Sequence, residues 1–114
     1  MANLSNTASA NQAAFGQMGS SFTNTSTELT PPDGHVIVAI QFLADTTVNS
    51  LSPENGDDGI CFGDGANEKG KASAGGQRIA AGTTIFPKGL TIYGRWTGVD
   101  VDADADGGVI CYFG

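Results

Sequence analysis

Three aspartates near the C-terminus are spaced like metal ligands. Asp102, Asp104 and Asp106 occupy alternate positions and Gly107 follows them, which matches the start of a calcium-binding loop. An EF-hand would also need a bidentate glutamate at the twelfth position of the loop, which here is Phe113. Two interpretations therefore stay open: a partial calcium site of another kind, or the solvated end of a hairpin whose carboxylates face water while the intervening valines and alanines face inward.

A second segment has the spacing of a phosphate-binding loop. Gly65-Ala66-Asn67-Glu68-Lys69-Gly70-Lys71 has the required glycines and final lysine, but Ala72 stands where the magnesium-binding hydroxyl belongs. Such a loop must also open a helix, whose N-terminus holds the phosphates. Ser73-Ala74-Gly75-Gly76 follows instead and favours no helix, so we expect no nucleotide site.

Catalysis has little support in the side chains available. His35 is the only histidine, and it follows a turn without a recognisable nucleophile, so we expect a hydrogen-bonded histidine at a strand edge. Cys61 and Cys111 lie in apolar, strand-like runs without the electropositive surroundings that activate a thiol. We expect two buried free thiols, with a disulfide as the alternative if their strands are neighbours, and we expect no enzymatic activity.

The elements that position these residues are predicted to be strands. The 114 residues include 17 glycines and only 15% charged residues, a composition typical of one all-β domain with many turns. We predict an antiparallel β-sandwich or small jelly-roll-like barrel. The expected strands cover residues 36–43, 46–51, 60–62, 77–81, 83–86, 90–97 and 109–113.

The expected strand over residues 90–97 organises the second half of the chain. A turn at Pro87-Lys88-Gly89 precedes it, and Trp96 supplies the largest apolar side chain, which should anchor the core or an interface. Gly94 interrupts this strand, which indicates a bulge or a close neighbouring backbone. The strand at 109–113 should pair with this one as a long hairpin.

The N-terminal third differs from the rest in composition. Glu28 is the only charged side chain in residues 1–32, and Pro31-Pro32-Asp33-Gly34 is a strong turn signal. We predict an attachment arm over residues 1–32 and a β-sandwich domain over 33–114. The arm is expected to contain a short helix at about 10–18, or else to be extended, and to bind a neighbour through four apolar residues: Leu4, Phe15, Met18 and Phe22.

The net charge of the chain makes some classes of binding partner unfavourable. A formal net charge of −7 and a pI of about 4.2 disfavour binding to nucleic acid and to anionic membranes. No apolar run approaches the ~20 residues of a membrane span, and the N-terminus lacks a signal-peptide core, so we expect no secretion by a signal peptide. Apart from the calcium ion considered for Asp102, Asp104 and Asp106, we expect no cofactor.

Three stretches resemble a known group of proteins. Phe86-Pro87-Lys88-Gly89-Leu90-Thr91-Ile92-Tyr93-Gly94-Arg95-Trp96-Thr97, followed by Gly108-Val109-Ile110-Cys111-Tyr112, is similar to the C-terminal signature of small structural proteins of tailed bacteriophages, marine and cyanobacterial ones in particular. Ala39 to Thr47 resembles their N-terminal core strand and turn. The likeness covers roughly residues 36–114, and its motifs are strands and turns rather than catalytic signatures.

The resemblance implies a role in the virion. It points to a capsid decoration, or cement, protein on the outer capsid surface, assembled in the host cytoplasm and bound to the major capsid protein. A homo-oligomer is expected, and a trimer would suit local three-fold positions. The alternative is a tail, neck or fibre module that contacts host glycans through exposed Trp96 or Tyr93. A small hydrolase that depends on His35 is the third hypothesis.

Overall fold

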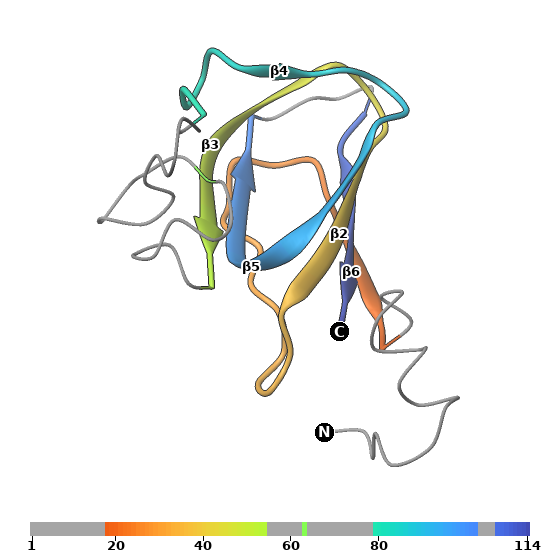
Figure 1. Ribbon diagram of the computed structural model, residues 1–114. Helices are drawn as coiled ribbons and strands as arrows, with labels where there is room; N and C mark the ends of the chain where they lie inside the picture. Colours follow the sequence, from red (N-terminus) through yellow and green to blue (C-terminus); the bar gives the residue numbers. More distant parts are fainter. Residues whose placement is uncertain (1–17, 55–62, 64–78, 103–106) are drawn as a thin grey trace.

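The computed structural model describes residues 18–54, 63, 79–102 and 107–114. This part of the chain is all-β and antiparallel, as expected, and contains no helix. Its six strands form one sheet in the order β1-β6-β2-β5-β3-β4 (Figure 1). The strands are β1 (Ser20–Thr23), β2 (Ile37–Phe42), β3 (Thr46–Pro53), β4 (Ile85–Phe86), β5 (Thr91–Val101) and β6 (Val109–Phe113).

The long strand β5 serves two parts of the sheet. Its first half pairs with β2 and its second half pairs with β3, and Trp96 lies in both registers, opposite Ile37 of β2 and Pro53 of β3. Both pairings have register shifts beside these residues, which is where a strand bends most readily. The sheet therefore curves around its own inner side (Figure 1).

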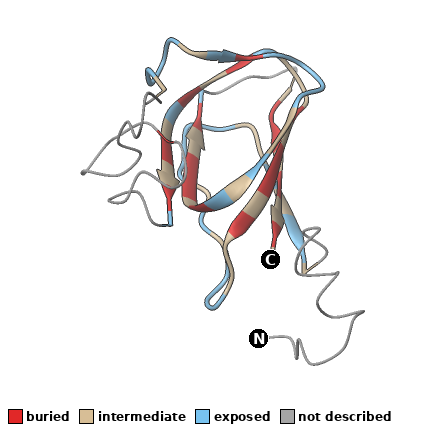
Figure 2. Cartoon of the chain, viewed as in Figure 1, coloured by how far each residue is buried: buried red, intermediate tan, exposed pale blue. Residues whose placement is uncertain are grey.

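The core fills the inside of this curve. β3 and β6 bury roughly every second residue, β2 and the second half of β5 bury most of theirs (Figure 2), and Trp96 has no exposed surface. The rings of Phe42 in β2 and Phe86 in β4 stack with centroids 4.7 Å apart, although two strands separate β2 from β4 in the sheet. This contact shows that the β4 end of the sheet curls back over β2. The prediction that Trp96 anchors the core is confirmed.

The expected hairpin between residues 90–97 and 109–113 is wrong. β2 lies between β5 and β6 and hydrogen-bonds both of them. β2 is the most apolar run of the chain, and a central strand satisfies its backbone on two sides while burying most of its side chains. Local sequence patterns indicate where the strands lie, but they do not indicate which strands pair with each other.

Two parts of the segment 18–30 pair with strands of the sheet. β1 pairs with β6, and farther along the Leu29 backbone exchanges two hydrogen bonds with Val99, with N···O distances of 2.8 and 3.0 Å. Leu29 also packs against the core. The boundary predicted between residues 32 and 33 thus follows a segment that pairs with β6 and with Val99 of β5. The expected helix at about 10–18 lies, apart from Met18, outside the described residues, as do Leu4 and Phe15.

The remaining predicted strands have different outcomes. The strand at 46–51 is confirmed as β3, and the one at 83–86 is confirmed at its end as β4. Ile79 packs against the core without forming a strand, and a turn follows in which Gly82 has a φ of 73° and donates to the carbonyl of Val48. The strand expected at 60–62, with Cys61, lies outside the described residues.

Candidate interaction surface

The outer side of the sheet carries two rows of side chains that cross four strands. Directly opposite residues of antiparallel strands point to the same side, so the register defines each row. We call the eight residues of these rows the aromatic face. One row consists of Ser20, Tyr112, Ala39 and Tyr93, and the other consists of Phe22, Ile110, Gln41 and Thr91.

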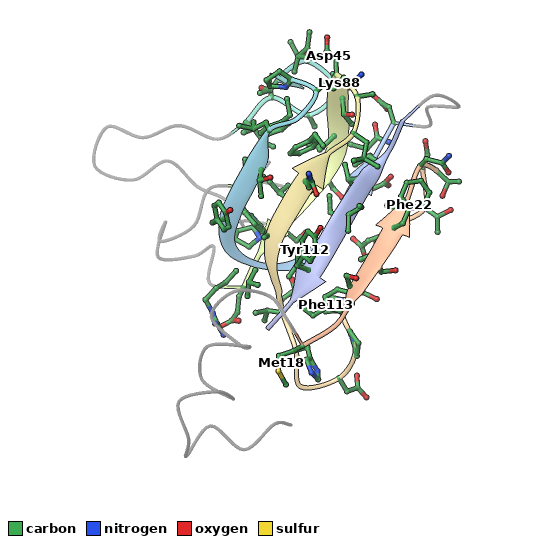
Figure 3. The ribbon with its side chains drawn as sticks, turned by 90° about the vertical axis from the view of Figure 1, so that its right-hand side faces the viewer. Met18, Phe22, Asp45, Lys88, Tyr112 and Phe113 are labelled. Atoms are coloured by element: carbon green, nitrogen blue, oxygen red, sulfur yellow. The ribbon has the colours of Figure 1, made fainter. Side chains whose placement is uncertain are left out.

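The aromatic face exposes large side chains to solvent. Tyr93 is 73% exposed and Phe22 is 54% exposed, and each lies near one border of the face. Tyr112 and Ile110 are half-buried between them, and the Tyr112 hydroxyl donates to Oε1 of Gln41 at 3.2 Å. Phe22 and Tyr112 lie on neighbouring strands on this side of the sheet (Figure 3). Large exposed apolar groups that gather in this way mark binding surfaces more often than scattered ones do.

The aromatic face is also free of charge. All eight of its side chains are neutral, although the chain carries a net charge of −7. The nearest charge along β5 is Arg95, which is exposed and forms an ion pair with Glu54 at 3.0 Å. A partner could cover the face without desolvating an ionised group, which is the costly step in forming many contacts.

The outer side of β3 and of the second half of β5 is different. There Thr47, Asn49, Asp100 and Asp102 form what we call the polar face. The Thr47 hydroxyl donates to the carboxylate of Asp102, and Nδ2 of Asn49 lies 3.4 Å from Oδ1 of Asp100. These contacts join the two strands across the sheet with polar groups alone.

The calcium hypothesis rests on one described residue. Asp102 is exposed, and its backbone N–H donates to the carbonyl of Thr47 at 3.1 Å. Asp104 and Asp106 lie outside the described residues. Across the described ranges, no group of three His, Cys, Asp or Glu side chains could hold a metal ion. Val99 and Val101 are fully buried, as in the solvated-hairpin interpretation, whereas Ala103 and Ala105 lie outside the described residues.

Trp96 cannot be the exposed aromatic that the glycan hypothesis required, because its side chain is fully buried. Gly94 helps to explain this placement. A Cβ atom at residue 94 would lie 2.7 Å from the Trp96 ring, so the missing side chain lets the indole lie against its own strand. Of the two predictions made for Gly94, the bulge agrees with the register, because β5 has one residue more than β2 between the pairs Tyr93–Ala39 and Trp96–Ile37. The close approach at Gly94 is made by a side chain two residues away rather than by a neighbouring backbone. Tyr93 remains as the exposed aromatic of this hypothesis.

The remaining candidate residues from the sequence, His35 and Cys111, are not part of the aromatic face. Nδ1 of His35 lies 3.1 Å from the carbonyl oxygen of Asp33, so this histidine has a hydrogen-bond partner, as expected. Cys111 is a free thiol in the core, and burial raises its pKa from 9.0 to about 12, which leaves it un-ionised and unreactive at neutral pH. The glycine- and lysine-containing loop at 65–71 lies outside the described residues.

Most of the aromatic face was missed at the level of sequence. The sequence alone places Phe22 in the arm and indicates Tyr93 only as a sugar-binding candidate. The strand Val109–Phe113 is apolar at almost every position, so its alternation could not tell which residues face the core. The register with β1 and β2 resolves this: Val109, Cys111 and Phe113 face inward, and Ile110 and Tyr112 face outward.

Comparisons with family models, with curated proteins and with solved structures gave no match. The described residues contain no helix that is long and apolar enough to cross a bilayer.

Proposed function

We propose that this protein is a capsid decoration protein of a tailed bacteriophage and that it binds the major capsid protein through the aromatic face. The observation that carries the binding role is the uncharged face with exposed Phe22 and Tyr93 on a strongly acidic chain. The partner class comes from the resemblance of residues 36–114 to small virion structural proteins. The proposed place is the outer surface of the virion, without catalysis.

The proposed mechanism is the joining of neighbouring capsid subunits by one bound domain. A contact of standard size buries ~800 Å² on each partner, which a face across four strands and its borders can supply. Burying a side chain such as Phe22 or Tyr93 contributes about 1.5–3 kcal/mol. When one protein contacts two subunits, separating them requires breaking both contacts together, so even moderate contacts strengthen the shell. The acidic remainder of the surface stays in water and keeps the protein soluble.

Cosedimentation with capsid shells stripped of accessory proteins tests this proposal. The wild-type protein should bind saturably, and Tyr93→Lys should weaken binding by roughly 30-fold, because an exposed aromatic side chain that becomes buried in an interface contributes about 2 kcal/mol. Asn49→Lys is the matched control, since it adds the same charge at an exposed residue of the polar face. Its binding should be unchanged. Equal loss in both variants would assign the effect to charge, and no binding by the wild type would remove the protein from the shell.

The exposure of Tyr93 favours one second candidate, a tail, neck or fibre module that binds host glycans. Tyr93 is 73% exposed and shares its face with the hydroxyl of Thr91 and the amide of Gln41, which are groups that can accompany a sugar stacked on an aromatic ring. A glycan-array signal that Tyr93→Ala abolishes, together with unchanged binding of that variant to shells, would replace the decoration role with this one.

A further inference from the structure

The two edges of the sheet differ in how they are protected against pairing. The β4 edge has two residues and is followed directly by Pro87 and Lys88, and the Lys88 backbone N–H donates to the Asp45 carboxylate at 2.8 Å (Figure 3). Proline, lysine and short length are the devices by which natural sheets keep an edge from pairing with another chain. The β1 edge, Ser20–Thr23, has neither a proline nor a charged residue.

The backbone of β1 offers a set of groups for a further strand. The N–H of Phe113 donates to the carbonyl of Gly19 at 2.8 Å, and the carbonyl of Phe113 accepts from the N–H of Met18 at 3.2 Å, so Gly19 and Phe113 are paired by one hydrogen bond rather than two. Such pairs alternate along an antiparallel ladder. Ser21 and Thr23 therefore direct their backbone groups toward β6, whereas Ser20 and Phe22 direct theirs to the side of β1 on which no other described strand lies. Two N–H and two C=O groups thus point outward.

We propose that two copies of this chain associate by pairing β1 with β1 in the antiparallel direction. A two-fold axis at Ser21 would place Ser20 of each copy opposite Phe22 of the other. In this register all the outward backbone groups of Ser20 and Phe22 find partners, and four hydrogen bonds join the two sheets. The two Phe22 rings become diagonal neighbours on the outer side, a spacing at which aromatic side chains reach one another.

The distribution of charge favours a second copy of this chain as the partner that pairs with β1. Two molecules of net charge −7 repel each other, so they can approach only where the surface near the contact is neutral. β1 lies in the one long stretch of the sequence without charge, because Glu28 is the first charged side chain and Asp33 is the next. A two-fold contact also lets the same neutral strand supply both sides of the interface.

This association would join the aromatic faces of the two copies into one continuous surface, because β1 is the border strand of each face. The inference does not rest on a capsid partner, since it follows from the edge, its backbone directions and its charge. It gives a two-fold dimer, whereas the symmetry of capsid positions suggested a trimer. The contact is small, so the association should be weak and should depend on concentration.

Sedimentation equilibrium of the full chain from about 10 µM to about 1 mM tests the proposal, because small interfaces dissociate in this range. We expect a reversible monomer–dimer equilibrium. Ser20→Pro removes one outward N–H without touching a group that faces β6, and Phe22→Lys places a charge at the pairing edge. Each should raise the dissociation constant at least ~10-fold. Circular dichroism should show that both variants keep the sheet.

Tyr93→Lys is the control, because it adds the same charge to the aromatic face three strands away from β1. It should leave the dimer unchanged while weakening the contact with shells, so the two proposals fail separately. A monomer at every concentration overturns the inference. A trimer overturns it as well. So does a dimer that survives both edge variants, or one that Tyr93→Lys abolishes, since each of these assigns the contact to another surface.

Discussion

The two parts of the sheet that meet at Trp96 have the same kind of inner side and opposite outer sides. Inside, both present buried apolar residues, such as Ile40 and Cys111 in one part and Val48 and Leu51 in the other. Outside, the first presents the aromatic face and the second presents the polar face. Folding requires the inner pattern, because the core depends on it, but it leaves the outer pattern largely free. The outer side is therefore the better guide to function.

Strand β5 makes this comparison within one element. Its first half directs Tyr93 outward at 73% exposure, and its second half directs Thr97 and Asp100 outward. The backbone environment is similar in both halves, since each is paired with a strand of the same sheet. A tyrosine exposed to this extent adds little to folding, whereas an interface would use it fully. The contrast supports a binding role for one side of the molecule and not for the other.

The largest expected effect tests whether the aromatics inside and outside differ as described. Trp96→Ala should lower the free energy of unfolding by about 3–5 kcal/mol, because it empties the position at which both parts of the sheet meet. Tyr93→Ala, three residues earlier on the same strand, should change it by less than about 1 kcal/mol. Urea denaturation measures both. Similar losses in the two variants would break the distinction between a core residue and a binding residue.

The N-terminal segment should matter for the stability of the fold, which is the next largest effect. Leu29→Ala should cost about 1–2 kcal/mol, less than for a fully buried leucine, because Leu29 is only partly buried against the core. Thr30→Ala, at an exposed neighbouring position, is the control and should be neutral. If Leu29→Ala left the free energy of unfolding unchanged, residues 18–30 would not contribute to the stability of the fold and could be a detachable arm.

Because β1 and Leu29 lie in residues 18–30, a shorter N-terminal deletion is the better test of attachment. If residues 1–32 were only an attachment arm, removing residues 1–30 would leave a folded domain that no longer attaches. That deletion would also remove β1 and Leu29, and with them the pairing to β6 and to Val99. Deleting residues 1–17 keeps these contacts and separates attachment from folding. Leu4 and Phe15 remain predicted partner-binding residues that such a deletion would test.

The sequence predicted the local features of the fold and missed the long-range ones. The apolar run at 36–43 and the alternation at 46–51 appear as β2 and β3. Such patterns can be recognised within a few consecutive residues, so they are visible in the sequence. The insertion of β2 between β5 and β6 is a matter of tertiary pairing, which no local pattern encodes. Three of the four residues 20–23 are polar and predict no strand, yet the segment forms β1, which hydrogen-bonds the backbone of β6 on the side away from β2.

The buried thiol predicts how stability changes at alkaline pH. In the unfolded chain Cys111 ionises near its ordinary pKa of 9.0, whereas burial raises its pKa in the fold to about 12. The raised folded-state pKa contributes stability that is complete below pH 9 and is lost between pH 9 and 12, by about 1.4 kcal/mol per pH unit. Cys111→Val should remove this dependence, so the difference between the two proteins at pH 8 and pH 10 isolates the thiol from lysine and tyrosine.

The smallest effect belongs to the polar face and sharpens the comparison from the other side. Thr47→Val removes the hydroxyl that donates to the Asp102 carboxylate but keeps a β-branched side chain suited to a strand. Because Asp102 is exposed, water can replace the lost hydrogen bond, and the free energy of unfolding should change by less than about 0.5 kcal/mol. Binding to shells should be unchanged, since the polar face is proposed to stay in water. If Thr47→Val instead weakened binding as much as Tyr93→Lys does, the partner would have to cover both faces, and the contrast between them would no longer assign the function to one side of the sheet.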